Sequence, residues 1–167
     1  KLDGSVFRSA LIMRPVFEAA ATANRRIVFA EGEDERVLRA ANAMIEETTD
    51  APVLIGRPEV IEMRAERAGL PIRPGRDFEI VNPENDPRYR DYWNTYHELM
   101  ARQGVTPDIA RAIMRTNTTA IAAIMVHRDE ADSMICGTFG QYSWHLNYVS
   151  QLLARDGLRP VGALSLM

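Results

Sequence analysis

The stretch RIVFAEGEDERVLRAANAMIEE, residues 26 to 47, joins an apolar segment to an amphipathic one. Its first five residues, RIVFA, are typical of a short buried strand, and the polar turn EGEDE follows directly. After the turn, apolar side chains recur at the spacing of one helical face. These side chains are Val37, Leu38, Ala41, Met44 and Ile45. A strand that runs into a helix in this way is the repeating unit of a parallel sheet covered by helices.

The same alternation continues through the rest of the chain. Apolar runs bounded by turn residues predict further strands, at 51–56, 78–82, 132–137 and 160–167. Helical periodicity predicts helices between them, at 58–69, 88–103, 106–115, 117–127 and 143–154. We therefore predict a three-layer α/β/α fold, with a mainly parallel sheet and helices on both faces, joined by right-handed crossovers.

Proline, threonine and glycine mark several helix ends. Pro58 and Pro107 suit the first helical turn, because the fixed φ of proline fits there and its missing N–H would have no helical partner. Thr106 precedes Pro107 as an N-cap. Gly69 and Gly104 suit C-terminal caps, where the chain must adopt a left-handed conformation. These residues fix the expected helix boundaries.

Composition and charge exclude several classes of protein. The chain has 167 residues and a formal net charge of -3, so no broad basic face indicates a nucleic-acid or anionic-membrane partner. The longest apolar run, AIAAIMV at 120–126, is too short to cross a bilayer. A single cysteine fits a reducing compartment, so we expect a cytoplasmic protein. Because the sequence stops within a predicted strand, we expect an internal piece of a longer polypeptide.

The predicted sheet also locates a candidate ligand site. In an open parallel sheet, ligands bind beyond the carboxyl ends of the strands. This rule selects four loops, at 31–34, 56–58, 82–86 and 137–142. The candidate ligand-binding residues in and beside these loops are Glu31, Gly32, Gly56, Arg57, Asn82, Gly137, Thr138, Gly140, Tyr142 and Asn147. Gly137 lets the chain turn out of the sheet, and Gly140 either does the same or makes room for a ligand.

The sequence lacks the common phosphate-binding motifs. The loop after the first strand has one glycine, and acidic residues crowd the helix start that a phosphate would need. Those acids complement the helix dipole, so capping is favoured over ligand binding there. No GxGxxG and no GxxxxGK[ST] occurs in the sequence. The GxxG at 137–140 follows a strand and contains no basic residue, which argues against an RNA-binding loop.

Cysteine and histidine give little support for nucleophilic or metal chemistry. Cys136 ends an apolar strand, and the nearest histidine in sequence, His145, falls in the following helix. A packed cysteine is therefore favoured over a nucleophile. His97, His127 and His145 lack the spacing of metal ligands, so we predict no metal site and assign them to the surface or to helix packing.

Four aromatic residues share one face of the predicted helix at 88–103. Tyr89, Tyr92, Trp93 and Tyr96 have the spacing i, i+3, i+4, i+7. Such a face is more often core or subunit interface than a platform for base stacking. We treat the four residues as interface candidates and expect a homo-oligomer assembled through this domain.

Several long strings resemble phosphotransacetylases. RRIVFAEGEDERVLRAA, LIGRP, YHELMARQGVTPDIAR and EADSMICG are similar to successive segments of that family, over about residues 25–167. A sharper resemblance, to the C-terminal phosphotransacetylase-like domain of large bacterial NADP-dependent malic enzymes, rests on IMRPVF, GLPIRPGRDFEIVNPENDPRYRDYW and RTNTTAIAAIMVHRDEADSMICGT. The resemblance implies a phosphotransacetylase or isocitrate-dehydrogenase-like fold, of which this chain is the first lobe. It implies that residues 1–24 are an arm from a preceding catalytic domain and that residues 25–167 are the first, truncated part of the phosphotransacetylase-like domain.

For a full-length protein, the resemblance implies oxidative decarboxylation of malate to pyruvate and CO2. NADP and Mg or Mn would be held by preceding domains, and this chain would hold no cofactor. The chain itself is expected to have no catalytic residue. Met100 and Asn147 stand where transacetylases carry arginines, and Gly140 replaces a histidine of the active loop, so charge stabilisation of the reacting groups would be lost.

The degenerate site leaves three hypotheses for function. The leading one, which the resemblance implies, is a regulatory and oligomerising domain that senses acetyl-CoA as an effector. The second is an active phosphotransacetylase, which converts acetyl-CoA and phosphate to acetyl phosphate and CoA. The third is a purely structural dimerisation module built on the helices at 89–96 and 117–127.

Overall fold

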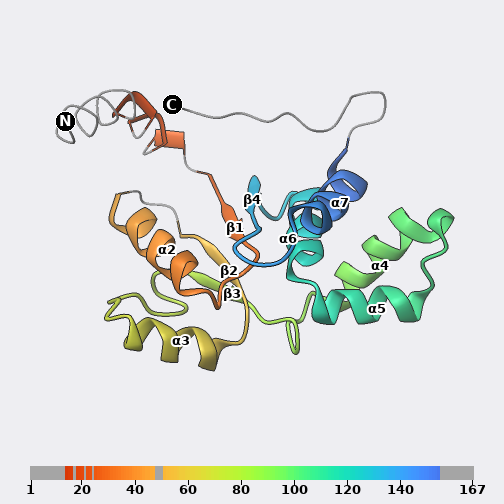
Figure 1. The fold of residues 1–167 in the computed structure, drawn as a ribbon, viewed down its shortest axis with the longest axis horizontal. Helices are drawn as coiled ribbons and strands as arrows, with labels where there is room; N and C mark the ends of the chain where they lie inside the picture. Colours follow the sequence, from red (N-terminus) through yellow and green to blue (C-terminus); the bar gives the residue numbers. More distant parts are fainter. Residues whose placement is uncertain (1–13, 17, 21, 24, 48–50, 155–167) are drawn as a thin grey trace.

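The computed structural model describes residues 14–16, 18–20, 22–23, 25–47 and 51–154, which contain a four-stranded parallel sheet (Figure 1). The strands are β1 (Ile27–Phe29), β2 (Val53–Ile55), β3 (Glu79–Val81) and β4 (Ser133–Ile135). Their order across the sheet is β3-β2-β1-β4, and every pair of neighbours is parallel. The predicted parallel α/β architecture is confirmed.

Helices follow the strands at the predicted places. They are α2 (Glu35–Glu47), α3 (Pro58–Arg67), α4 (Tyr89–Met100), α5 (Pro107–Thr116), α6 (Thr118–His127) and α7 (Tyr142–Leu153). The long helix predicted at 88–103 ends in a 3-10 turn, Ala101–Gln103, before Gly104 takes the left-handed φ of 86°. Thr106 caps α5 as predicted, because its hydroxyl accepts a hydrogen bond from the amide of Ile109.

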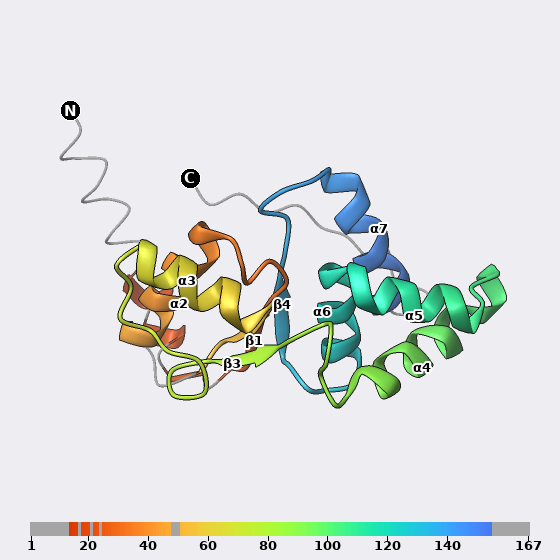
Figure 2. The same ribbon diagram turned by 90° about the horizontal axis from the view of Figure 1, so that it is seen from below.

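The pleat of the strands sorts their side chains into two cores. Val28 of β1 pairs with Val53 of β2, and both face the core formed with α4, α5, α6 and α7. The next pair along, Phe29 and Leu54, points to the opposite face and packs against α2 and α3. Figures 1 and 2 show the same division, with α2 and α3 on one side of the sheet and α4 to α7 on the other. The predicted three layers follow from this alternation.

Helix α6 forms the centre of the larger core. Residues 119–125 of α6 are all buried, including Thr119, so the run AIAAIMV belongs to a helix enclosed by its neighbours on every side. Asn117 caps this helix: it is 4% exposed, and its Oδ1 accepts a hydrogen bond from the amide of Ala120 at 2.9 Å. No helix in the described part of the chain is long and apolar enough to span a membrane. The strand predicted at 160–167 and most of the predicted arm at 1–24 lie outside the described residues.

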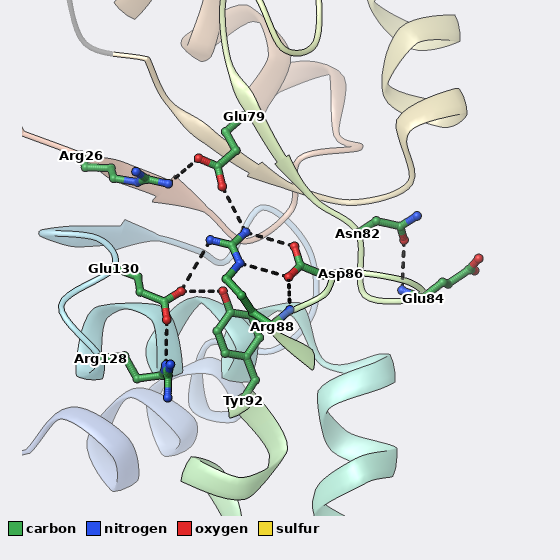
Figure 3. A network of polar contacts seen from close by, with 9 residues as sticks. All are labelled: Arg26, Glu79, Asn82, Glu84, Asp86, Arg88, Tyr92, Arg128 and Glu130. Atoms are coloured by element: carbon green, nitrogen blue, oxygen red, sulfur yellow. Dashed lines mark hydrogen bonds and ion pairs between the residues drawn. The ribbon is translucent and has the colours of Figure 1, made fainter. Parts of the chain in front are cut away.

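Arg88 ties the start of β3 to the turn between α6 and β4 (Figure 3). Its guanidinium lies 3.0 Å from Glu79 Oε1 and 3.0 Å from Asp86 Oδ2, and 3.6 Å from Glu130 Oε2. Tyr92 donates a hydrogen bond to the same Glu130 oxygen at 2.7 Å. The Asp86 carboxylate, by hydrogen bonding, holds the pKa of Arg88 above its ordinary value. The network therefore joins the start of β3, the start of α4 and the turn before β4 through one fixed charge.

Replacing Arg88 tests this network. We expect Arg88→Gln to lower the free energy of unfolding by about 2 kcal/mol, because several partly buried carboxylates lose a charged partner. The stability of Arg88→Lys should lie between those of the unaltered protein and Arg88→Gln, because an ammonium group keeps the charge but cannot make the same fork of hydrogen bonds. Urea unfolding followed by tryptophan fluorescence measures the difference. The exposed Arg90, on the same helix, is the control, and a loss no larger for Arg88→Gln than for Arg90→Gln would contradict the role.

Candidate functional site

A cavity of about 420 Å³ opens at the carboxyl edge of the sheet. Each of the four predicted loops contributes to its lining, which includes Glu31, Glu33 and Asp34 after β1, Gly56 and Arg57 after β2, Pro83 and Glu84 after β3, and Phe139 after β4. Ala30 and Ile55 add apolar surface from the strand ends. The volume falls in the range of about 300–1,000 Å³ that is usual for small-molecule sites. The rule for open parallel sheets thus located the one region where all four loops meet.

The ten predicted site residues separate into lining and supporting positions. Glu31, Gly56 and Arg57 line the cavity. Gly32 is buried, and a Cβ there would lie 2.8 Å from the carbonyl oxygen of Ile55, so close packing of the loop requires glycine. Asn82 is also buried, and its Oδ1 accepts a hydrogen bond from the amide of Glu84 at 3.0 Å (Figure 3). Gly32 and Asn82 therefore shape the loops without facing the cavity.

The loop after β4 contributes a different residue from those predicted. Phe139 lines the cavity and is 62% exposed, whereas Tyr142 and Asn147 are exposed on α7 and are not lining residues. Thr138 contacts the helical layer formed by α2 and α3, because its carbonyl oxygen accepts a hydrogen bond from the Arg36 side chain of α2. The sequence did contain a signal for Phe139, because this aromatic residue lies between Gly137 and Gly140. Glycines allow the tight turns that let a side chain between them project from a loop.

A buried polar cluster holds the loop after β4 in place. Both carboxylate oxygens of Glu31, which is 4% exposed, accept the amide of Gly137 at 3.1 and 3.2 Å. His145 Nδ1 lies 2.8 Å from Thr119 Oγ1 and 3.8 Å from Glu31 Oε1. His145 Nε2 lies 2.7 Å from the carbonyl oxygen of Phe139, and a carbonyl only accepts, so Nε2 carries the proton. His145, predicted to be a surface or packing residue, is buried and anchors the loop.

Gly140 makes room for the His145 side chain that anchors this loop. Its φ of 90° confirms that it turns the chain, as Gly137 does with a φ of 99°. The space beside Gly140 is taken, because a Cβ there would lie 3.1 Å from His145 Nε2. The buried imidazole of His145 thus occupies the space that the absent Gly140 side chain leaves.

Cys136 lies just beyond β4, beside the same cluster. It is partly buried, and burial raises the pKa of its thiol, with a further increase from the nearby charge of Glu31. Both effects oppose formation of the thiolate, which is the nucleophilic form. The raised pKa of the Cys136 thiol therefore agrees with the predicted packed cysteine. The described residues contain no group of three or more His, Cys, Asp or Glu side chains that could hold a metal ion.

Arginines from two helices complete the cavity wall. Arg57 makes a two-pronged ion pair with Glu33, with both N···O distances at 2.9 Å, and this pair lowers the pKa of Glu33. Arg64 of α3 donates to the carbonyl oxygen of Glu33, and Arg115 of α5 donates to the carbonyl oxygens of Pro83 and Glu84. The sequence prediction missed Arg64 and Arg115 because neither follows a strand. The seven-residue interval between Arg57 and Arg64, two helical turns, was a signal for the first of them.

Asp34 begins α2 and keeps its charge. Its Oδ1 accepts a hydrogen bond from the amide of Arg36 at 2.9 Å, and its Oδ2 lies 2.8 Å from the Arg36 guanidinium. This partner lowers the pKa of Asp34 from 3.8 to about 2. The capping role predicted for the acids of this loop is confirmed at Asp34.

The aromatic stripe of α4 is divided between core and surface. Tyr92 and Tyr96 are each 2% exposed in the core of this chain, and burial raises the pKa of Tyr96 to about 12. Of the two alternatives for this face, core or subunit interface, these two residues take the core, because their rings are enclosed by the chain itself. Tyr89 and Trp93 are partly buried and lie beneath the guanidinium groups of Arg115 and Arg111, respectively.

The geometry defines an open parallel α/β module with a mixed-charge cavity at its strand ends. The family model described as phosphate acetyl/butaryl transferase matches residues 11–167. The chain therefore belongs to the phosphate acetyl/butaryl transferase family, as the sequence resemblance predicted.

Two curated relatives and one solved structure refine this placement. The chain is 58% identical over 169 residues to the NAD-dependent malic enzyme of Rhizobium meliloti (strain 1021), covering 100% of this chain and 22% of that protein. It is 47% identical over 166 residues to the NADP-dependent malic enzyme of Salmonella typhimurium, covering 99% of this chain and 22% of that protein. The chain thus spans about a fifth of the length of these relatives. A phosphotransacetylase from Streptococcus pyogenes has a similar structure, with a TM-score of 0.72 and 25% identity over 84% of this chain and 42% of that chain.

Gly140→Ala tests the packing of the loop against His145. A left-handed backbone costs a residue with a Cβ about 1–2 kcal/mol, and the contact with the buried imidazole adds to that cost. Gly137→Ala is the matched control, because Gly137 has a similar φ but nothing within 4 Å of its Cβ position. We expect the free energy of unfolding to fall further for Gly140→Ala than for Gly137→Ala. Equal losses in chemical denaturation would show that His145 does not constrain residue 140.

Asp34 gives a pH-dependent test of the cap. Because its folded pKa is lowered from 3.8 to about 2, the charge stabilises the fold above about pH 4, and this contribution is lost as pH falls toward 2. Asp34→Asn keeps the cap and removes the charge, so its deficit in unfolding free energy should vanish near pH 2. Asp34→Ala removes the cap as well, and its deficit of about 1 kcal/mol should persist. Denaturation curves from pH 2 to 7 measure both, and a constant Asp34→Asn deficit would contradict the shift.

Proposed function

We propose that this chain is a non-catalytic regulatory and oligomerisation domain of a malic enzyme, and that it senses acetyl-CoA at the strand-end cavity. In the full-length protein, other domains carry out the oxidative decarboxylation of malate to pyruvate and CO2, with a nicotinamide cofactor and Mg or Mn. The proposal is supported by similarity to malic enzymes over essentially the whole chain. The family resemblance implies NADP as this cofactor. The two relatives are named for different nicotinamide cofactors, which fits cofactor choice being made outside this domain.

The observation that carries the proposal is that neutral residues occupy the two positions at which the resemblance places transacetylase arginines, and that neither residue lines the cavity. Met100, where the resemblance places an arginine of active transacetylases, is 3% exposed in the core. Asn147, at the second such position, is neutral and exposed on α7. Acyl transfer from a thioester depends on preorganised donors at the developing charge, and removing one such donor costs about a hundredfold or more in rate. The loss of both arginines therefore favours binding over turnover.

Oligomerisation through this domain needs a surface other than the one first expected. The helices at 89–96 and 117–127 supply the chain's own core, which removes the main support for a purely structural dimerisation module. Exposed aromatic side chains occur instead around the start of α7, where Phe139, Tyr142 and Trp144 are 62%, 73% and 46% exposed. Aromatic residues are enriched at interfaces between proteins, so we assign the oligomer contact to this segment.

A cytoplasmic location is part of the same proposal. The one cysteine of the chain is unpaired and partly buried, which fits a reducing compartment.

An activity assay with acetyl-CoA tests the regulatory role. Acetyl-CoA must bind one conformational state of the enzyme more tightly than another if it is to change activity. We expect the rate of malate oxidation by the full-length polypeptide, followed as NAD(P)H absorbance, to change about fivefold or more with saturating acetyl-CoA. A polypeptide without this domain should keep its basal rate and lose the response. A response that survives the deletion would sink the proposal.

The family match gives one specific reason to consider an active phosphotransacetylase. Formation of acetyl-CoA from acetyl phosphate and CoA by the full-length polypeptide decides between the two functions. The neutral residues Met100 and Asn147 lead us to expect no turnover above the uncatalysed rate. Measurable turnover that is lost on deletion of this domain would replace the sensor with an enzyme.

A further inference from the structure

The segment from β4 to the end of α7 carries no formal charge. Residues 133–154 contain no Asp, Glu, Lys or Arg, and no other such run in the sequence is as long, although 26% of the chain is charged. The one histidine of the segment, His145, is buried. Glu31, which bonds to the loop after β4, is buried as well, and Arg36, which bonds to it from α2, is paired with Asp34. Depletion of charge is typical of the buried centre of an interface between proteins.

Large apolar side chains are exposed along the same segment. Ile135, Phe139, Tyr142 and Trp144 are 48%, 62%, 73% and 46% exposed. β4 is the outermost strand of the described sheet, and the helices that cover Phe29 of β1 leave its neighbour Ile135 on β4 uncovered. Strands of a parallel sheet are normally covered on both faces, so this side of the module has no covering element among the described residues.

The loop between β4 and α7 is also part of the cavity. Phe139 is a lining residue, and the hydrogen bond between its carbonyl oxygen and His145 Nε2, at 2.7 Å, holds its backbone in place. Gly137 and Gly140, on either side, turn the chain with φ angles of 99° and 90°. Tyr142 follows Phe139 by three residues. A protein surface that packs on Phe139 and Tyr142 would therefore close the cavity on the side of β4.

We infer that a second copy of the chain packs on this uncharged segment and closes the cavity beside Phe139, so that assembly and ligand binding depend on each other. In a twofold contact a surface meets itself, so a charge near the axis faces a like charge. A neutral surface avoids that repulsion, and aromatic residues carry much of the binding energy at interfaces. The inference rests on the proposed function for the homo-oligomer and for acetyl-CoA as the ligand. Linkage makes the two effects equal: assembly tightens acetyl-CoA binding by the same factor as acetyl-CoA tightens assembly.

Charge variants of Tyr142 test the contact in the full-length polypeptide. Tyr142 is 73% exposed and does not line the cavity, so a charged side chain there leaves the core and the lining unchanged. Tyr142→Glu alone and Tyr142→Lys alone place like charges on both copies. We expect each to lower the mass of the assembly to half or less, because a twofold contact joins two equal parts, in light scattering at low ionic strength.

Mixing the two variants shows whether the partner is a second copy. Equal amounts of Tyr142→Glu and Tyr142→Lys place opposite charges across the contact and should recover the mass of the unaltered assembly. A variant that had merely misfolded would not be rescued in this way. Met63→Glu is the control, because Met63 is 57% exposed on α3, in the opposite helical layer, and its replacement should leave the mass unchanged.

Two measurements test the link to the cavity. In calorimetric titration, we expect Tyr142→Glu to weaken acetyl-CoA binding about fivefold although residue 142 does not line the cavity, and the mixed variants to bind as the unaltered polypeptide does. Hydrogen exchange needs no ligand: the cavity loops at 31–34 and 56–58 should exchange faster in Tyr142→Glu than in the unaltered polypeptide, because the cavity has lost its cover.

The outcomes separate this inference from the proposed function. If the mass falls while acetyl-CoA affinity and loop exchange stay the same, the homo-oligomer stands and the link to the cavity is wrong. If the variants keep their mass, or mixing does not restore it, another part of the polypeptide covers the segment and the inference is wrong, whereas acetyl-CoA sensing is untouched. If acetyl-CoA fails to bind the unaltered polypeptide, the proposed effector is wrong, and the mass and the loop exchange of the variants decide the inference.

Discussion

The buried carboxylate of Glu31 is the constraint on which the cavity depends. It is 4% exposed, just beyond the end of β1, and its hydrogen-bond donor is the backbone amide of Gly137 in the loop after the neighbouring strand β4. A buried carboxylate without partners costs several kcal/mol, so the loop after β4 must keep that amide in place. The central strand therefore determines where the β4 side of the cavity lies.

Contacts from both helical layers then fix the same loop. His145 of α7 joins the carbonyl oxygen of Phe139 to Thr119 of α6, which places the loop against the larger core. Arg36 of α2 donates to the carbonyl oxygen of Thr138, which places it against the other layer. Because the loop is held from both sides, a change in the packing of either layer would reach Phe139 and the cavity. That geometry is what a domain that couples a ligand to its surroundings requires.

The sequence predicted those features that local physics determines. Strands and helices were found because apolar periodicity and caps such as Thr106 act within a few residues, and the four loops followed from the parallel sheet. Arg64 and Arg115 were missed because each lies on a helix, and the direction of a helical side chain depends on how the helix packs. For the same reason, the sequence left His145 either on the surface or in helix packing, and only the structure shows that it is buried. The tyrosines of α4 show the same limit: periodicity identified their shared face but not the core that covers Tyr92 and Tyr96.

The charges of the cavity fit a sensor better than a catalyst for a physical reason. A catalyst holds its donors ready for charge that develops during reaction, so that no partner exchange is needed at that moment. Here the donors of Arg57 already bind Glu33, and a bound anion would have to exchange with that carboxylate. Such an exchange would lower affinity, and it would give the wall a second arrangement in which Arg57 pairs with the ligand and not with Glu33. Two arrangements separated by a small free energy are what a ligand needs in order to shift a population.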